Sequence, residues 1–468
     1  MDFYLDADDH RRGLARALYE KIRQAIAEGR IRPGDQLPPS RELAKQLAIS
    51  RFTVTTAYGY LVAEGFLEGA SAAGTRVTLP ARRGQLRRAA PPAFRGTAPS
   101  PPTNEPAAVT PAMQMELGVP DAASFPYTEL RTQTWRAMRE LRAAGGTQYG
   151  DAAGEPSLRA AIATWIHRSR GVRATPDEVV VTAGAQQAFD IVLSALTRPG
   201  DTVAVEDPGY PPFRQLAELR GAKVVPVQAD DHGLIVESLP PRARLVYVTP
   251  SHQFPLGSVL SLVRRRLLLD WAQATGAVIL EDDYDSEFRF SDRPLEPMQR
   301  LDTGARVIYV GSFSKSLSPS LRTGFVIAPR EIVSALAGVR QLLDCHSPAL
   351  LQRTLARFLD DGSMDRHLRR MRKLYRTRHQ FIVDWFAGPG HSLGHLIAID
   401  AGLHLTAELH APWDEQTLCT RALDAGLRIS GLSKFSVESI RPGLSFGYGN
   451  TPPEKLEAAF RILRKVTR

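Results

Sequence analysis

The sequence predicts a multidomain chain in which a small helical domain precedes a large α/β domain and a smaller α+β lobe. Three observations predict this order: apolar residues recur at helical spacing near the start, a Pro- and Ala-rich stretch follows, and apolar strand runs then alternate with helical segments. We expect domains at residues 1–80 and 113–468, joined by a linker at 81–112. Within the second domain we expect a large lobe at about 120–330 and a small lobe at about 331–468.

The composition excludes several classes of protein. The chain has 468 residues and only two cysteines, Cys345 and Cys419, whose spacing fits neither a disulfide scaffold nor a zinc site. We therefore expect no metal and a reducing compartment. The first residues are acidic, unlike a signal peptide, and no apolar run reaches the roughly 20 residues of a membrane helix. These features predict a cytoplasmic protein without a membrane partner.

Positive charge is concentrated in the first quarter of the chain. Residues 10–80 carry 11 Lys and Arg against 6 Asp and Glu, and residues 81–112 carry 5 arginines against Glu105. Such a basic region favours a polyanionic partner, although it could also serve solubility alone.

The first 80 residues predict three helices and two short strands. Apolar residues at a spacing of four predict an amphipathic helix from Leu14 to Glu28, which Gly29 ends. Ser40 is expected to cap a second helix, and Ser50 a third that runs from Arg51 to about Glu64. The segments FLEG and GTRVTL then predict two strands.

A helix-turn-helix followed by two strands is the order of a winged helix-turn-helix, which reads double-stranded DNA. Its second helix enters the major groove and presents N-terminal side chains to the bases. The candidate DNA-contacting residues are therefore Arg41, Ser50, Arg51, Thr53 and Thr55. Periodicity alone would also fit a helical protein-interaction domain.

The amino-acid sequence of this segment resembles the winged helix of GntR-type regulators over residues 10–80. The phrases LPPSRELA, ISRFTV and LVAEGFLE carry the resemblance. The expected wing tip, Gly69–Gly74, departs from the family because it has no basic residues. The arginine-rich linker would then supplement the phosphate contacts.

After the linker, apolar strand runs alternate with helices, which predicts a largely parallel sheet. We expect strands at Val179–Thr182, Val203–Glu206, Val224–Val227, Leu245–Val248, Val278–Glu281, Val307–Val310 and Gly324–Ala328. A helix is expected at Gln186–Leu196, and strands of the small lobe at Ile397–Asp400 and Leu444–Tyr448, before a last helix from Glu454.

Polar residues after these strands fit the needs of pyridoxal 5′-phosphate (PLP). The aldehyde of PLP needs a lysine, for which Lys315 in GSFSKSLS is the candidate Schiff-base residue. Its pyridine nitrogen needs a carboxylate, and Asp282 follows a strand. Tyr284 can donate to the ring oxygen, and Tyr210 in EDPGY can stack on the ring.

The phosphate of PLP needs amides, hydroxyls and a cation. The turn Gly184-Ala185-Gln186 offers amides at a helix N-terminus, and Ser312, Ser314 and Arg322 complete the cup. Open α/β sheets bind ligands at the carboxyl ends of their strands, where all these residues are expected. Each of them alone could be an ordinary loop or surface residue.

Residues 113–468 resemble a fold-type I aminotransferase, and the whole chain resembles the MocR/PdxR subfamily of GntR regulators. The phrases TQYGDAAGEPSLRAAIATWI, VVVTAGAQQAFD, VYVTPSHQFPLG and ILEDDYDSEFRF carry the match. The resemblance implies that PLP is bound at Lys315 with the partners named above. It also implies that Tyr149 reaches the phosphate of a neighbouring subunit's cofactor, in a head-to-tail homodimer.

Two departures from the aminotransferase pattern concern the ligand. Phe254-Pro255-Leu256-Gly257 stands where many aminotransferases have Asn-Pro-x-Gly, so His252 or Gln253 would have to replace the asparagine that touches the ring oxygen. Gly443 stands where relatives have an arginine for a substrate carboxylate; Arg441, on the same face of a strand, is the candidate to replace it.

These observations favour a PLP-dependent transcription regulator whose large domain senses PLP, a small amine such as taurine or γ-aminobutyrate, or an amino acid. The alternative is an active aminotransferase with an accessory DNA-binding domain, and a weaker one is an assembly module. A fused basic winged helix has no use in a metabolic aminotransferase, which favours the regulator.

Overall fold

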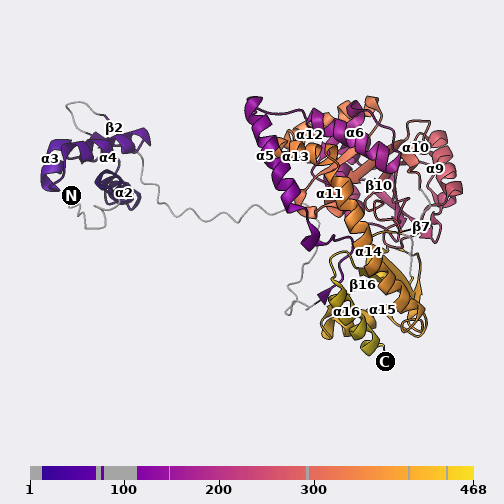
Figure 1. Ribbon diagram of the computed structural model, residues 1–468. Helices are drawn as coiled ribbons and strands as arrows, with labels where there is room; N and C mark the ends of the chain where they lie inside the picture. Colours follow the sequence, from indigo (N-terminus) through magenta and orange to yellow (C-terminus); the bar gives the residue numbers. More distant parts are fainter. Residues whose placement is uncertain are drawn as a thin grey trace. The chain divides into compact units, whose positions relative to one another are not determined.

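The computed structural model describes residues 13–69, 75–78, 113–146, 148–290, 295–398, 401–438 and 441–467. The chain divides into two compact units, Met1–Thr97 and Ala98–Arg468 (Figure 1). The predicted linker and nearly all of the predicted wing tip lie outside the described residues. Within those residues, no helix has both the length and the apolar character needed to cross a membrane.

The described residues of the N-terminal unit form three helices and a small antiparallel sheet. The unit contains α2 (Leu14–Ala27), α3 (Ser40–Gln46), α4 (Arg51–Ala63), β1 (Gln36–Leu37), β2 (Leu67–Glu68) and β3 (Thr75–Val77), with strand order β1-β3-β2. Leu18, Ile22 and Ile26 of α2 are buried in its core, as their spacing predicted. The strand β1 was missed because two residues are too few to show an alternating pattern.

One predicted cap is wrong and the other is confirmed. Ser40 is the first residue of α3, and the position before it is held by Pro39, so the Ser40 hydroxyl does not cap the helix. Ser50 does cap α4, because its Oγ accepts a hydrogen bond from the backbone N–H of Thr53 at 3.0 Å.

The large lobe is built on an eight-stranded sheet. Its strands, in spatial order, are β5 (Val179–Thr182), β12 (Gly324–Ile327), β11 (Val307–Ser312), β10 (Val278–Asp283), β9 (Ala243–Val248), β6 (Thr202–Asp207), β7 (Lys223–Asp230) and β8 (Gly233–Leu234). The central pairs are parallel, whereas β12 is antiparallel to both neighbours and β8 to β7. The prediction of a largely parallel sheet is confirmed.

Helices cover both faces of this sheet, which explains the continuous apolar runs of its strands. On β5, Val180 packs with α7 (Ala185–Leu196) and α12 (Arg330–Asp344). Its neighbours Val179 and Val181 pack instead with α6 (Pro156–Arg170) and α13 (Ala349–Asp360) on the other face. A strand buried on both sides has no polar face, so its sequence does not alternate.

The remaining helices of the large lobe are α5 (Tyr127–Ala143), α8 (Pro211–Leu219), α9 (Leu262–Thr275), α10 (Met298–Leu301) and the single turn α11 (Phe313–Ser316). Both α12 and α13 pack on the large lobe, so the small lobe begins later than residue 331, within α14 (Ser363–Ala387).

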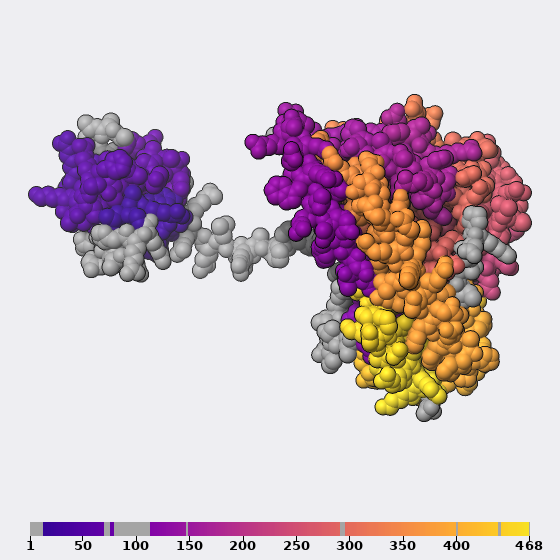
Figure 2. Space-filling model, in the orientation of Figure 1, coloured from indigo at the N-terminus to yellow at the C-terminus, as the bar shows by residue number. Residues whose placement is uncertain are grey.

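The small lobe has an antiparallel sheet of order β13-β14-β17-β16. These strands are β13 (Gly394–Leu396), β14 (His404–Leu409), β16 (Ser430–Gly431) and β17 (Gly443–Gly447), and they pack with α15 (Glu415–Asp424) and α16 (Pro453–Val466). Figure 2 shows the C-terminal residues, in yellow, lying against the orange residues of the same lobe. The strand predicted at Ile397–Asp400 is not found at Ile397 and Ala398, because β13 ends at Leu396, and residues 399–400 lie outside the described residues.

The first described residues of the second unit, from Met113 on, pair with a strand of the small lobe. Strand β4 (Met113–Gln114) pairs in parallel with β15 (Leu427–Arg428), although more than 300 residues separate them along the chain. This pairing of β4 with β15 could not be predicted from the pattern of apolar residues within either segment.

Candidate functional site

A cavity of about 250 Å³ lies where several strands of the large sheet end. Its lining residues are Leu117, Gly118, Ala185, Gln186, Phe189, Tyr210, Tyr247, Phe254, Asp282, Tyr284, Ser312, Ser314, Lys315, Pro319 and Arg322. Most of them come from the carboxyl ends of β5, β6, β10 and β11 and from the turn before β12. Tyr247 and Phe254 belong to β9 and the loop after it, and Leu117 and Gly118 lie in the segment after β4. Nine of the residues predicted for the cofactor line this one cavity, and a tenth, Gly184, is the N-cap residue of the helix that begins with Ala185.

Lys315 lies in α11, directly after β11, with its amine directed at Gly118. A Cβ atom added at Gly118 would lie 3.0 Å from the Lys315 Nζ, so glycine leaves room for the amine. Burial lowers the pKa of Lys315, against the opposing effect of Asp285 and Asp282. A lowered pKa makes the uncharged, nucleophilic amine easier to form.

Asp282 lies inside β10 rather than after it, and it is buried against the cavity. Its Oδ2 accepts a hydrogen bond of 2.7 Å from the Tyr247 hydroxyl. Its Oδ1 is buried and has no hydrogen-bond partner among the described residues. Burial raises the pKa of Asp282 to about 7, although the Tyr247 hydrogen bond acts in the opposite direction. The site therefore holds a carboxylate oxygen that lacks a donor.

The N-terminus of α7 and Arg322 form one end of the site. Gly184 is the N-cap of α7 with φ 86°, and a Cβ atom there would lie 3.1 Å from Arg322 Nη2. Arg322 donates from Nη2 to the Ala183 carbonyl at 3.0 Å. Ser312 and Ser314 line the same cavity. Free amides, hydroxyls and a guanidinium together suit a phosphate.

Aromatic rings enclose the rest of the cavity. Tyr210 packs edge-on against Phe254, with 5.4 Å between the ring centroids, and burial raises the pKa of Tyr210 to about 12. The Tyr284 hydroxyl lies 2.9 Å from Nδ1 of His252. Sequence reasoning missed Tyr247, whose place in a buried apolar strand gives no signal of a polar role.

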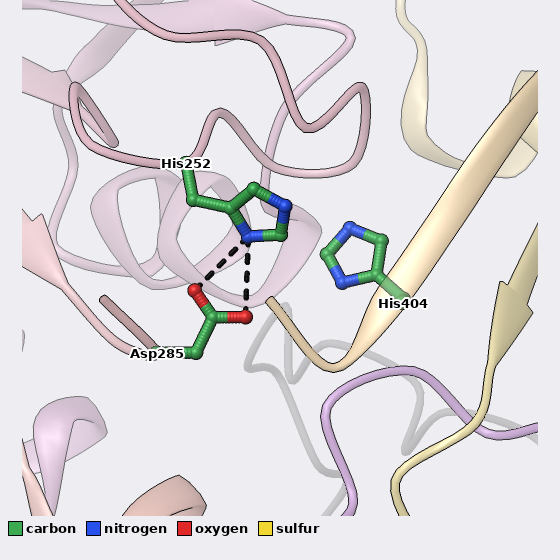
Figure 3. Close-up of side chains that lie close together, drawn as sticks. All are labelled: His252, Asp285 and His404. Carbon is green, nitrogen blue, oxygen red and sulfur yellow. Dashed lines mark hydrogen bonds and ion pairs between the residues drawn. The ribbon is translucent and has the colours of Figure 1, made fainter. Parts of the chain in front are cut away.

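Behind Tyr284, His252 and Asp285 of the large lobe meet His404 of the small lobe (Figure 3). All three side chains are buried. Histidine and aspartate also occur in metal sites, which sequence reasoning from the cysteines did not anticipate. Here His252 and Asp285 bind each other, with 3.0 Å between Nδ1 and Oδ1.

Besides Gly184, two residues predicted to contact the cofactor or a ligand do not line this cavity. Arg441 lies between the lobes, where its guanidinium pairs with Glu408 and with Asp231. Tyr149 has 86% of its surface exposed and contacts the ring of His346 edge-on.

In the N-terminal unit, the predicted DNA-contacting residues gather at the start of α4. Arg51 and Thr55 are exposed on its first turns, and Arg41 is exposed at the start of α3. Arg51 Nε lies 3.4 Å from the Ser40 hydroxyl, which brings the starts of the two helices together. Phe52, which is 79% exposed beside Arg51, adds an apolar side chain to this surface.

Both units match known protein families. Residues 14–77 match the family described as bacterial regulatory proteins, gntR family, and residues 114–442 match aminotransferase class I and II. The chain is 35% identical to the probable rhizopine catabolism regulatory protein MocR of Rhizobium meliloti, covering 96% of this chain and 93% of that protein. The chain belongs to this family of regulators.

Another relative of this GntR-family regulator supports the same assignment. The chain is 32% identical to the HTH-type pyridoxine biosynthesis transcriptional regulator PdxR of Corynebacterium glutamicum, over 94% of this chain and 92% of that protein. GntR-type regulators bind DNA, and class I and II aminotransferases depend on PLP in general. The relatives support a transcription regulator over a working aminotransferase.

Solved structures agree with the fold of the second unit of the regulator. The α-aminoadipate aminotransferase of Thermus thermophilus is 30% identical with a TM-score of 0.68, over 76% of this chain and 91% of that one. The kynurenine aminotransferase of Pyrococcus horikoshii shares the fold, with a TM-score of 0.71 at 24% identity, over 77% of this chain and 91% of that one.

Proposed function

We propose that this regulator binds PLP at Lys315 and that occupancy of the cavity controls how its N-terminal unit binds operator DNA in the cytoplasm. The ligand sensed is PLP itself, or an amine or amino acid that reacts at the same place. The observation that carries the proposal is the buried Asp282 Oδ1, which lacks a donor beside a cavity that also holds a lysine.

The residues of the cavity fit the cofactor group by group. PLP supplies an aldehyde that reacts with primary amines and a ring that withdraws electrons when its nitrogen is protonated. The Lys315 amine would form a C=N bond to the aldehyde carbon, while the aldehyde oxygen leaves as water with the two amine hydrogens. Asp282 Oδ1 would accept the hydrogen of the pyridine nitrogen and hold the ring protonated.

The other end of the cofactor would lie at the N-terminus of α7. The Ala185 and Gln186 amides, the Ser312 and Ser314 hydroxyls and the Arg322 guanidinium would hold its phosphate dianion. Tyr210 would cover the ring face, and Tyr284 would donate to the ring oxygen beside the aldehyde. Arg441 would serve a carboxylate only after leaving Glu408 and Asp231, so we propose it only as a secondary contact.

We further propose a head-to-tail homodimer in which Tyr149 reaches the partner's cofactor phosphate. Large apolar side chains support such an interface, because Tyr149, Trp135 and Leu342 are 86%, 65% and 89% exposed. For DNA, we propose that Arg51, Thr53 and Thr55 face the bases in the major groove. Arg41 and the start of α4, which Ser50 caps, would contact the phosphates.

Trapping the lysine bond tests the central part of this proposal. The purified protein is incubated with PLP, treated with borohydride to reduce any C=N bond, and digested for peptide mass mapping. We expect the pyridoxyl mass on Lys315 in the wild type and none in Lys315→Ala, with exposed Lys434→Ala as the matched control. Cofactor found only on surface lysines, with no visible absorbance band, would refute the assignment.

A further inference from the structure

The hydrogen bonds of His252 define which of its nitrogens carries hydrogen. Nδ1 lies 3.0 Å and 3.1 Å from the two oxygens of Asp285, which also accepts the Leu403 N–H at 3.2 Å. A carboxylate accepts hydrogen bonds and cannot donate, so the hydrogen is on Nδ1. Figure 3 shows the His252 ring with this nitrogen turned to Asp285.

This tautomer determines what Tyr284 can do. The Tyr284 oxygen lies 2.9 Å from the same Nδ1, which has one hydrogen and no free lone pair. Tyr284 therefore cannot donate to His252, and its own hydrogen remains free for the cavity that it lines. Burial and then the Asp285 charge raise the pKa of Tyr284 well above its ordinary value, so the hydrogen stays on the phenol.

The neighbouring residue Gln253 cannot orient the Tyr284 hydroxyl as His252 does. Its Nε2 donates to the Pro208 and Phe254 carbonyls at 2.7 and 2.8 Å, and its Oε1 accepts the Leu256 N–H at 3.1 Å. These bonds shape the loop, and Gln253 does not line the cavity. Of the two residues that could replace the missing asparagine, only His252 contacts Tyr284.

The small lobe closes on the other side of His252. A Cβ atom at Gly402 would overlap the His252 ring, so the chain of the small lobe lies directly against it. The His404 ring follows, with 4.8 Å between its centroid and that of His252. His404 Nε2 and Thr406 Oγ1 both lie within hydrogen-bond distance of the Pro255 carbonyl, at 3.2 and 2.6 Å.

His404 is neutral and adds no positive charge to this cluster. Its Nε2 faces a carbonyl and therefore carries the hydrogen, and burial lowers the pKa of His404 to about 3. The other charged or titratable groups that act on Tyr284 or His404 are Asp282, Asp283, Glu206 and Lys315, all on the large-lobe side. The start of β14 thus meets the cavity through neutral His404 and the His252–Asp285 pair.

We propose that His252 is a positioning residue for Tyr284, and that the His252–Asp285–His404 cluster transmits occupancy of the cavity to strand β14 of the small lobe. A ligand oxygen that accepts the Tyr284 hydrogen holds the Tyr284 oxygen beside His252 Nδ1, whose single hydrogen Tyr284 shares with Asp285. Asp285 also accepts the N–H of Leu403, directly before β14, so the position of Tyr284 is linked through His252 and Asp285 to the start of that strand. The inference rests on the proposed binding of PLP beside Tyr284.

The first test follows the absorbance of protein-bound PLP as a function of pH in the wild type, His252→Asn and the exposed-histidine control His232→Asn. Without His252, the Asp285 carboxylate is free to take the Tyr284 hydrogen, so the cofactor ring oxygen loses a donor and holds its proton more tightly. We expect the spectral midpoint to rise by about one pH unit in His252→Asn and to stay unchanged in the control. Asp285→Asn, which keeps the shape of the side chain, should shift it in the same direction.

The second test measures amide hydrogen exchange of residues 403–409 with and without PLP. We expect PLP to slow exchange there by roughly threefold or more in the wild type and to have no such effect in His252→Asn. An unchanged midpoint together with unchanged PLP-dependent protection in His252→Asn would overturn the inference. One equivalent of zinc that is retained by the wild type and lost in His404→Ala would overturn it as well. A wild type without any PLP band would remove the proposed function, and this inference with it.

Discussion

Replacing Asp282 by asparagine separates the stability of the protein from its function. Burial raises the pKa of Asp282 from 3.8 to about 7 in the absence of a cofactor. Between those two pH values the folded chain keeps a proton that the unfolded chain releases, so stability falls as the pH rises through this window. A difference of about 3 pKa units corresponds to an upper limit of about 4 kcal/mol at pH 8.

Asp282→Asn removes this penalty while keeping an acceptor for Tyr247 and adding an N–H where Oδ1 lacks a partner. We expect the cofactor-free variant to melt roughly 3–6 °C higher than the wild type at pH 8, and at nearly the same temperature at pH 4. With PLP bound, we expect the wild type to have the higher melting temperature. The variant loses the charge that holds the pyridine nitrogen protonated, and we expect its affinity to fall at least about tenfold.

The adjacent carboxylate supplies a control of opposite sign. Asp283 is equally buried, but Arg170, Ser286 and Tyr309 bind it and hold its pKa below the ordinary value despite that burial. Asp283→Asn breaks a buried ion pair and should destabilise the protein by about 3–5 kcal/mol at pH 8. Thermal unfolding of the three proteins at both pH values is the assay. A cofactor-free Asp282→Asn that melts at or below the wild-type temperature at pH 8 would refute the reasoning.

Three further predictions concern the lysine and the N-terminal unit. Lys315→Ala should abolish the visible absorbance of bound PLP while circular dichroism stays unchanged; a retained band would contradict the assignment, and exposed Lys434→Ala should keep the band. Arg51→Ala should weaken specific operator binding by about 1–3 kcal/mol in a fluorescence anisotropy titration, whereas Arg30→Ala, whose side chain pairs with Glu28, should have little effect; equal losses would exclude α4 as the reader. Ser50→Ala removes the N-cap of α4 and should lower the unfolding free energy of the N-terminal unit by about 1 kcal/mol, measured by urea denaturation, with Ser40→Ala as the uncapped comparison.

The sequence was most informative where one local pattern determines one element. Strand β5 was predicted with its observed bounds, because a short apolar run ends at a Gly-containing turn. The cavity residues were predicted by the rule that ligands bind at the carboxyl ends of parallel strands, and nine of them meet there. Ser50 was predicted as a cap because it stands directly before the helix that begins at Arg51.

The error at Ser40 is local, whereas other features that the sequence did not show depend on contact between distant parts of the chain. Ser40 was taken for a cap because a hydroxyl before a helix usually is one, but α3 starts one residue earlier, after Pro39. Arg441 is the candidate for a ligand carboxylate, and its pairing with Asp231 of the large lobe, more than 200 residues away in sequence, could not be predicted from its own strand. The meeting of His252 with His404 depends on how the two lobes close, which no local pattern encodes.

The most direct test of the central claim is the dissociation constant of the full-length protein for its own upstream DNA, measured with and without PLP in the wild type and in Lys315→Ala. If the cavity governs the N-terminal unit, PLP should change the wild-type dissociation constant by roughly fivefold or more and leave that of Lys315→Ala unchanged. Wild-type protein that carries PLP on Lys315 and yet binds the DNA with the same dissociation constant in both conditions would contradict the account.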